Sequence, residues 1–247
     1  MCTMPDQEAV LSTQSPAAAV PAAAFFDVDN TLLHGSSLFL FGRGAVRERI
    51  ITLRELLQFA YKQFRFKRVG ENLSHMKSFQ EQALRLIAGR SVAELEESLE
   101  RVCDTYVIPK IWPEALELIE REEANGRDVW LITATPIQIA DEIARQVGAT
   151  GALATVPAED DGVFTGELVG PVVHAEVKTQ VATRLAHERG YSLPDSSAYS
   201  DSANDVTLLA LVGHPFATNP DAKLRAIARQ RSWPVIFLHR KGKRRRR

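Results

Sequence analysis

Two carboxylates stand two positions apart at the end of an apolar run, in the stretch Phe25-Phe26-Asp27-Val28-Asp29-Asn30-Thr31. Alternate side chains of a β-strand point to the same face, so Asp27 and Asp29 are expected to project together where the strand ends. Like charges held this close need a cation, a shared proton or strong hydrogen bonds. Taken alone, the stretch fits either a solvated strand end or a reaction centre.

The ends of the other predicted strands carry side chains of matching chemistry. In open parallel sheets, ligands bind beyond the carboxyl ends of the strands. A hydroxyl, an ammonium near a helix start and two more acids are therefore expected to meet the first pair at one rim: Thr133, Lys178, Asp201 and Asp205. Carboxylates with loop carbonyls and water are hard oxygen ligands, which suit Mg²⁺.

This set of residues has a natural use in phosphoryl transfer. Asp27 is expected to attack phosphorus as a carboxylate nucleophile, and Asp29 to protonate the leaving alcohol and later deprotonate the attacking water. The hydroxyl of Thr133 and nearby backbone N–H groups, such as that of Ala134, are expected to hold the phosphoryl oxygens. Lys178 then offsets the charge that develops on those oxygens.

The elements that must position these residues alternate between strand and helix. Short apolar runs predict strands, while glycine and proline mark the ends of the helices between them. The fold class expected is α/β, with a doubly wound, mainly parallel Rossmann-like sheet and an inserted all-helical cap. The predicted strands are Ala22–Asp27, Val129–Ile132, Ser197–Ser200, His214–Ala217 and Pro234–Leu238, with a β-hairpin within Leu153–Val169.

The cap is predicted from three amphipathic patterns in a segment that offers no strand. These helices are expected over 50–64, 73–86 and 92–107. The division expected is a disordered lead-in at 1–20, a core at 21–33 plus 109–239, a helical cap at 34–108 and a disordered basic tail at 240–247.

The composition is that of a soluble globular chain: 247 residues, 45% hydrophobic and 25% charged, with room for a sizeable core. The net charge of −1 gives no global field for nucleic acid. Neither Cys2 nor Cys103 has a CxxC or metal-finger spacing, which favours a reducing compartment. No apolar run reaches the ~18 residues of a membrane span, and residues 1–20 lack the pattern of a secretion signal. We therefore expect a cytoplasmic protein.

A cationic run closes the sequence at Lys241-Gly242-Lys243-Arg244-Arg245-Arg246-Arg247. Such runs are generally disordered and solvated. No module for reading a nucleic-acid sequence is predicted, so any contact of this tail with nucleic acid or an anionic membrane is expected to be nonspecific.

Four motifs in order make the chain similar to the haloacid dehalogenase-like (HAD) hydrolases, in particular the phosphoserine-phosphatase-like subgroup. The DxDxT motif is met by Asp27-Val28-Asp29-Asn30-Thr31, and the Ser/Thr motif at the end of an apolar strand by Thr133. The lysine motif at a helix start is met by Lys178, and the acidic motif by Ser200-Asp201-Ser202-Ala203-Asn204-Asp205. The resemblance spans residues 22–238.

The resemblance implies a Mg²⁺-dependent phosphatase that forms an aspartyl-phosphate on Asp27 and acts on a small phosphorylated metabolite. It implies that Mg²⁺ is held by Asp27, the backbone carbonyl of Asp29 and Asp201. It leaves two roles open for Asp205, as a ligand through water or as the partner that orients Lys178. It also implies that Asn204 contacts the phosphate and that the helical segment closes over the substrate.

One position departs from the subgroup. Phosphoserine phosphatases usually carry a glutamate nine residues after the nucleophile, where this chain has Ser36, and only Glu48 or Glu55 stand nearby as substitutes. Phosphoserine, histidinol phosphate, and choline-like or glycerol-like phosphates all remain candidate substrates. Two other functions use the same residues: a regulatory protein that binds a phosphometabolite, and a phosphotransferase with an alcohol acceptor.

Overall fold

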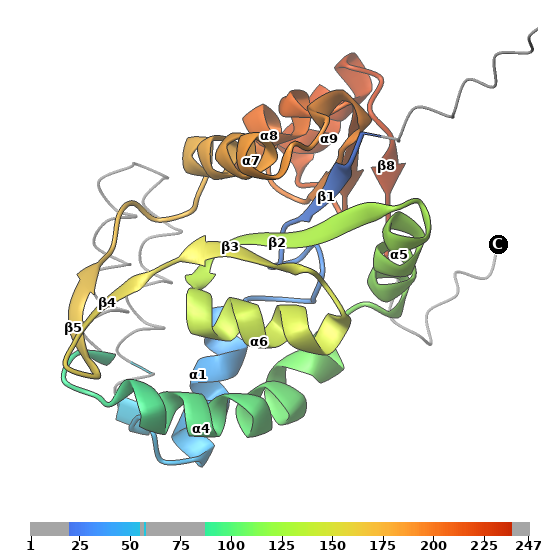
Figure 1. Cartoon of the computed structure of the whole chain (residues 1–247). Coiled ribbons are helices and arrows are strands. Elements are labelled where there is room, and N and C mark those ends of the chain that lie inside the picture. Colours follow the sequence, from blue (N-terminus) through green and yellow to red (C-terminus); the bar gives the residue numbers. More distant parts are fainter. Residues whose placement is uncertain (1–19, 55–56, 58–86, 239–247) are drawn as a thin grey trace, which may run out of the picture.

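The computed structural model describes residues 20–54, 57 and 87–238, and a six-stranded sheet forms its centre (Figure 1). The strand order is β3-β2-β1-β6-β7-β8, and every neighbouring pair is parallel. The predicted α/β class with a doubly wound parallel sheet is therefore confirmed. The strands are β1 (Ala22–Phe26), β2 (Arg127–Pro136), β3 (Gly151–Thr155), β6 (Ser197–Ser200), β7 (His214–Thr218) and β8 (Val235–Ile236).

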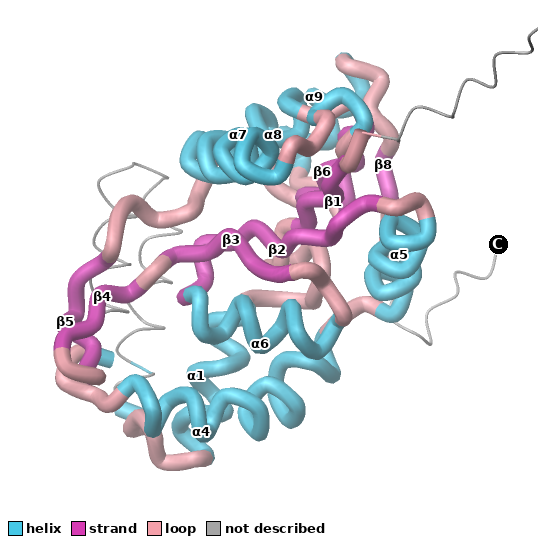
Figure 2. Tube along the Cα trace, viewed as in Figure 1, coloured by secondary structure: helices cyan, strands magenta, loops and turns pink. Residues whose placement is uncertain are grey.

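Helices cover both faces of this sheet (Figure 2). Alternate residues of β1 serve the two cores: Ala24 and Phe26 pack on one face, and Ala23 and Phe25 on the other. The face of Ala24 and Phe26 is covered by α5 (Pro113–Ala124) and α6 (Ile137–Val147), and the other face by α7 (Glu176–Arg189), α8 (Val206–Leu211) and α9 (Ala222–Gln230).

Among the described residues, no helix is long and apolar enough to cross a membrane.

A stack of three aromatic rings fixes the centre of the sheet. Tyr199 of β6 lies between Phe26 of β1 and Phe216 of β7, with ring centroids 4.2 and 4.7 Å apart. The phenol of Tyr199 donates a hydrogen bond to the buried carboxylate of Glu122 on α5, which also pairs with Arg127 at 2.7 Å. The strands that precede Asp27 and Asp201 are thus held in register by close-packed rings.

Two further helices, α1 (Ser37–Arg47) and α4 (Val92–Val102), lie on the α6 side of the sheet (Figure 1). The sequence predicts one helix over Val92–Val107, but the α-helix ends at Val102. A π-helical turn over Cys103–Val107 and a 3₁₀ turn over Ile108–Lys110 follow it. Pro109 has no N–H to donate to a carbonyl one turn earlier, so the hydrogen-bond ladder of a regular α-helix does not continue through it.

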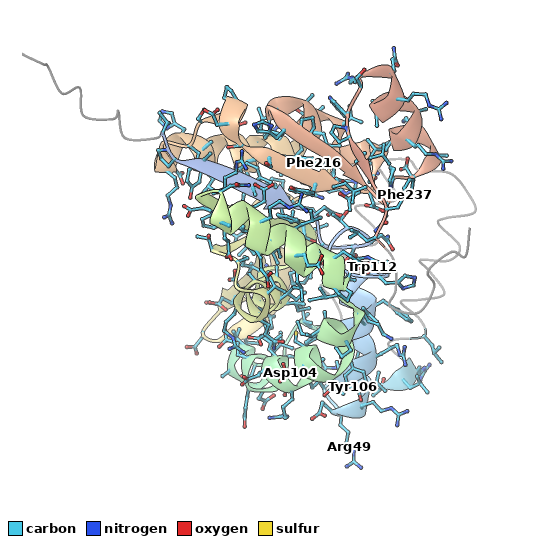
Figure 3. All side chains as sticks on the ribbon, turned by 90° about the vertical axis from the view of Figure 1, so that its right-hand side faces the viewer. Arg49, Asp104, Tyr106, Trp112, Phe216 and Phe237 are labelled. Carbon is cyan, nitrogen blue, oxygen red and sulfur yellow. The ribbon has the colours of Figure 1, made fainter. Side chains whose placement is uncertain are left out.

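Tyr106 of the π-helical turn packs toward α1. A Cβ atom at Gly44 of α1 would come within 2.6 Å of the Tyr106 ring and 2.5 Å of Val102 Cγ1. Figure 3 shows Asp104 and Tyr106 at the end of the molecule built from α1 and α4, away from Phe216 in the sheet. Close approach of the two helices therefore depends on the missing side chain of Gly44.

The predicted cap at 34–108 is described only in its outer parts, 34–54, 57 and 87–108, which carry α1, α4 and the two turns. The helix predicted over 73–86 and most of the one over 50–64 lie outside the described residues. So do residues 1–19 and 239–247, which include the predicted basic tail. The division into core and cap therefore stays a prediction.

The predicted hairpin is present but shorter than expected. The antiparallel strands β4 (Pro157–Asp160) and β5 (Val163–Leu168) pair around the turn at Asp161-Gly162. Leu153, which was expected to belong to the hairpin, lies in β3 and pairs with Ile132 of the main sheet. Its short apolar run joins the edge of the sheet because one side of β2 is free to pair there.

Candidate active site

A buried ion-pair cluster lies at the carboxyl ends of β1 and β6. The ammonium Nζ of Lys178 donates to Oδ1 of Asp27 at 2.6 Å and to Oδ2 of Asp205 at 2.7 Å. The hydroxyl of Thr31 donates to Oδ2 of Asp27 at 3.0 Å, and that of Ser200 donates to Oδ2 of Asp205 at 2.7 Å. Both oxygens of Asp27 thus have a donor, and Lys178 is only 3% exposed.

Local backbone structure explains why Asp27 leaves the sheet at this point. Its N–H still donates to the carbonyl of Tyr199 at 2.9 Å, which extends the β1–β6 ladder by one residue. The chain then turns, because the N–H groups of Leu32 and Leu33 both donate to the carbonyl of Val28. Lys178 comes from the first turn of α7, whose N-terminus faces the same rim.

A second hydrogen-bonded group surrounds Asp29. Oδ1 of Asp29 accepts from the backbone N–H of Ser37 at 2.8 Å and from the Ser37 hydroxyl at 2.6 Å. The Ser37 hydroxyl also lies 2.7 Å from that of Thr135, which in turn accepts from the Thr133 hydroxyl at 3.2 Å. Asp29 and Thr133 are therefore joined through two hydroxyls.

Asp201 follows β6 and is half-buried near the same cluster. Burial raises the pKa of Asp201 to about 8, with the carboxylates of Asp27 and Asp205 adding to the effect. Burial likewise raises the pKa of Asp27 to about 6, although the adjacent Lys178 ammonium opposes the rise. Three carboxylates here meet one lysine ammonium, so the cluster holds more negative charge than its own cation offsets.

That excess of charge on oxygen ligands fits a divalent cation such as Mg²⁺. Within residues 20–54, 57 and 87–238, no three Asp, Glu, His or Cys side chains form a ready group of metal ligands. The predicted ligand set uses the side chains of Asp27 and Asp201 and the backbone carbonyl of Asp29, and it stays a prediction. The side chain of Asp29 accepts hydrogen bonds from Ser37, and that of Asp205 accepts from Lys178 and Ser200. Mg²⁺ commonly binds one or two carboxylates together with water and substrate phosphate, which the remaining pair Asp27 and Asp201 can supply.

Two predicted substrate residues lie at the rim without joining either group. Ala134 is exposed between the buried Thr133 and Thr135 at the end of β2. Asn204 is also exposed, on the 3₁₀ turn Ala203–Asp205, and no hydrogen bond links its side chain to the cluster in the part of the chain described.

The structure adds polar residues that sequence reasoning did not single out. Thr135 could have been found from its spacing, because it lies two positions after Thr133 on the same strand and therefore on the same face. Ser37 carries no such signal, since its contact depends on where α1 begins. The added residues are Ser37 and Thr135. Thr31 and Ser200 already belong to the sequence motifs, and the structure shows them donating to Asp27 and Asp205.

The family model for haloacid dehalogenase-like hydrolases matches residues 24–210 of the chain, which include all of the residues above. A curated relative from Mycobacterium tuberculosis, named phosphoserine phosphatase SerB1, is 46% identical over 225 residues. The match covers 91% of this chain and 73% of that protein. A protein of Neisseria meningitidis named histidinol-phosphatase is 30% identical over 217 residues, covering 86% of this chain and 97% of its own length.

A solved structure has the same architecture. The crystal structure of a protein of unknown function from Bordetella pertussis Tohama I is 31% identical and superposes with a TM-score of 0.79. The likeness covers 88% of this chain and 98% of that one.

Proposed function

The chain belongs to the haloacid dehalogenase-like hydrolase family and is a phosphoric monoester hydrolase of its phosphoserine-phosphatase-like group; we propose that it cleaves small phosphomonoesters with Mg²⁺, through an aspartyl-phosphate on Asp27. The observation that carries this proposal is the bridge from Lys178 to both Asp27 and Asp205. A lysine buried between two carboxylates fixes the carboxylate that attacks and supplies positive charge at the phosphoryl group.

Asp27 has the surroundings of a nucleophile. Lys178 and Thr31 each donate to one of its oxygens, so the carboxylate has a fixed orientation. Burial removes competing water, which strengthens the local electrostatic interactions. Of the two roles that the resemblance leaves open for Asp205, its hydrogen bonds from Lys178 and Ser200 favour the one that orients the lysine.

We assign to Asp29 the role of general acid and base. It stands two residues from Asp27, and its charge contributes to the raised pKa of that carboxyl, which indicates that the two groups are close. Asp29 would give a proton to the oxygen of the departing alcohol and then take one from the water that cleaves the intermediate.

Mg²⁺ would be held by the side chains of Asp27 and Asp201 and by the backbone carbonyl of Asp29. When bound, the ion supplies positive charge that offsets the phosphoryl oxygens and the excess carboxylates. Thr133, with the exposed backbone at Ala134 and the side chain of Asn204, would hold the other oxygens of the phosphoryl group.

We propose 2-aminoalkyl phosphates as the substrate class. The names of the two relatives give phosphoserine and histidinol phosphate, which share a phosphate on a primary alcohol and an amine on the neighbouring carbon. Ser36 has a hydroxyl in place of the usual carboxylate, and this hydroxyl accepts from the N–H of Phe39 at 3.5 Å as the N-cap of α1. Glu48 pairs with Arg101 at 3.6 Å, and Glu55 lies outside the described residues.

A substrate panel tests the proposal. The purified protein is assayed for phosphate release from phosphoserine, histidinol phosphate, glycerol phosphate and an aryl phosphate, in Mg²⁺ and in EDTA. We expect turnover in Mg²⁺ only, with kcat/KM at least about tenfold higher for the two amino esters, which corresponds to about 1.4 kcal/mol. Equal rates with glycerol phosphate would reject the amine as a recognised group. If the protein transfers the phosphoryl group to an alcohol, adding an alcohol acceptor to the assay will give a phosphorylated alcohol as a product.

We also propose a cytoplasmic location, which the buried free thiol of Cys103 supports. Cell fractionation with an antibody against the protein tests it. The contact of the basic tail with anionic surfaces falls on residues outside those described and stays a prediction, for which salt-sensitive binding to anionic vesicles is the test.

A further inference from the structure

We propose that Ser37, the first residue of α1, is a positioning residue that aligns Asp29 for proton donation to the leaving group. This inference rests on the proposed function, in which Asp29 is the general acid. Two separate donors of Ser37, its backbone N–H and its hydroxyl, reach the same oxygen of Asp29 at 2.8 and 2.6 Å. Both contacts hold Oδ1, and Oδ2 lies outside this network.

The hydroxyls behind Ser37 have one consistent orientation. Each hydroxyl has a single proton to donate. Thr133 donates to Thr135, so the proton of Thr135 is available for Ser37, and the proton of Ser37 for Asp29. Without substrate the row therefore runs in one direction, from Thr133 to Asp29. When a phosphoryl group binds, the Thr133 proton would turn to one of its oxygens, and Thr135 and Ser37 would keep their direction.

Burial makes this arrangement specific. Ser37 is 0% exposed, and Thr133 and Thr135 are 3% and 4% exposed, so water does not readily replace a missing hydroxyl. The backbone N–H of Thr135 also donates to the Thr133 hydroxyl at 3.2 Å, which ties the row to the end of β2. Since Ser37 opens α1, the orientation of Asp29 is coupled to the position of that helix.

The hydrogen bonds that orient Asp29 are separate from those that orient the nucleophile Asp27. Asp27 takes its hydrogen bonds from Thr31 and Lys178, and none of the three hydroxyls of the row bonds to it. Loss of the Ser37 hydroxyl is therefore expected to disturb proton donation while the attacking carboxylate keeps its partners.

Comparing esters with different leaving groups shows whether a variant has lost proton donation or nucleophilic attack. A nitrophenolate departs readily without a proton, whereas an alkoxide needs one, so a misaligned acid penalises an alkyl phosphate more than p-nitrophenyl phosphate. The experiment measures kcat/KM for both esters with Mg²⁺ in the wild type and in Ser37→Ala. We expect the ratio of the alkyl to the aryl value to fall roughly tenfold or more, out of the roughly 10²–10⁴-fold that a general acid supplies.

Two further variants serve as a second test and as a control. Thr135→Val keeps the shape of the side chain and removes the donor to Ser37, so the ratio is expected to fall in the same direction even if Ser37→Ala does not fold. Ser98→Ala removes a buried serine hydroxyl of α4, which donates to the backbone carbonyl of Glu94, and its ratio is expected to match the wild type. Equal losses on both esters in Ser37→Ala and Thr135→Val, or the same fall in Ser98→Ala, would overturn the positioning role. A wild type that hydrolyses neither ester would overturn the proposed function itself, and this inference with it.

Discussion

The ammonium of Lys178 lies 2.6 Å from Oδ1 of Asp27, although 151 positions separate the two residues in the sequence. The same ammonium reaches Asp205 at 2.7 Å, so one cation joins the strand end of β1 to the turn after β6. Local sequence cannot create such a contact. It follows from a parallel sheet that gathers the carboxyl ends of its strands at one rim.

Removing this cation is expected to cost both stability and activity. Lys178→Met leaves Asp27 and Asp205 as buried carboxylates without their countercharge. Breaking a buried ion pair in this way typically costs about 3–5 kcal/mol in the free energy of unfolding. Urea denaturation measures the loss, with Lys223→Met on the exposed face of α9 as the control, expected within about 0.5 kcal/mol of the wild type. A loss below about 1 kcal/mol in Lys178→Met would contradict the structural role of the bridge.

The raised pKa of Asp201 predicts how stability changes with pH in EDTA. Burial raises this pKa to about 8, while an unfolded aspartate titrates near its ordinary value of about 3.9. Between these values the folded protein binds more protons than the unfolded chain. The contribution of Asp201 to stability is therefore full below about pH 4 and is lost as the pH rises through about 8.

Asp201→Asn isolates that contribution. Urea denaturation in EDTA between about pH 5 and 8 should show a free energy of unfolding that falls less steeply with pH in the variant than in the wild type. The control is Asp160→Asn, at an exposed acid in β4, which should keep the wild-type slope. Parallel curves for Asp201→Asn and the wild type would show that Asp201 does not titrate with a raised pKa.

Cys103 is expected to be chemically inert in the folded protein. Burial raises the pKa of its thiol to about 12, and the nearby carboxylates of Glu142 and Asp104 act in the same direction. Since the thiolate is the reactive form, an aromatic disulfide reagent should label Cys103 only after unfolding. The assay uses a Cys2→Ser background so that Cys103 supplies the whole signal. Rapid labelling without denaturant would contradict this burial.

Gly44 is expected to be essential for the packing of α1. A side chain there overlaps Val102 and Tyr106, and overpacking of this kind typically costs about 1–3 kcal/mol. Gly44→Val should therefore lower the free energy of unfolding by about that amount, as measured by thermal or urea denaturation. Arg43→Val places the same new residue on the exposed face of the same helix and should cost less than about 1 kcal/mol. If both variants lose the same amount, the overlap is not the cause.

The sequence was most informative where local signals are strong. Glycine marks the ends of helices α6 and α7 as expected, because each helix ends before a glycine in the left-handed region, at Gly148 and Gly190. The strand ends after Phe26 and Ser200 were also predictable, since apolar runs stop there at acids.

The remaining features depend on contacts between distant segments. The Ser37 contact with Asp29 requires the position of α1, and the edge strand β3 is recognised only by its pairing with β2. The π-helical turn before Pro109 is likewise invisible to helical periodicity, because Val102, Cys103 and Val107 are all buried and prolong the pattern.

The most direct test of the account is phosphate release by Asp27→Asn, measured against the wild type in Mg²⁺ on an aryl phosphate and on phosphoserine. Asparagine keeps the shape of the side chain but removes the attacking carboxylate. We predict a loss of at least roughly 10³-fold in kcat, as for the removal of other covalent nucleophiles. A correctly folded Asp27→Asn protein that retains wild-type turnover would contradict the proposed aspartyl-phosphate mechanism.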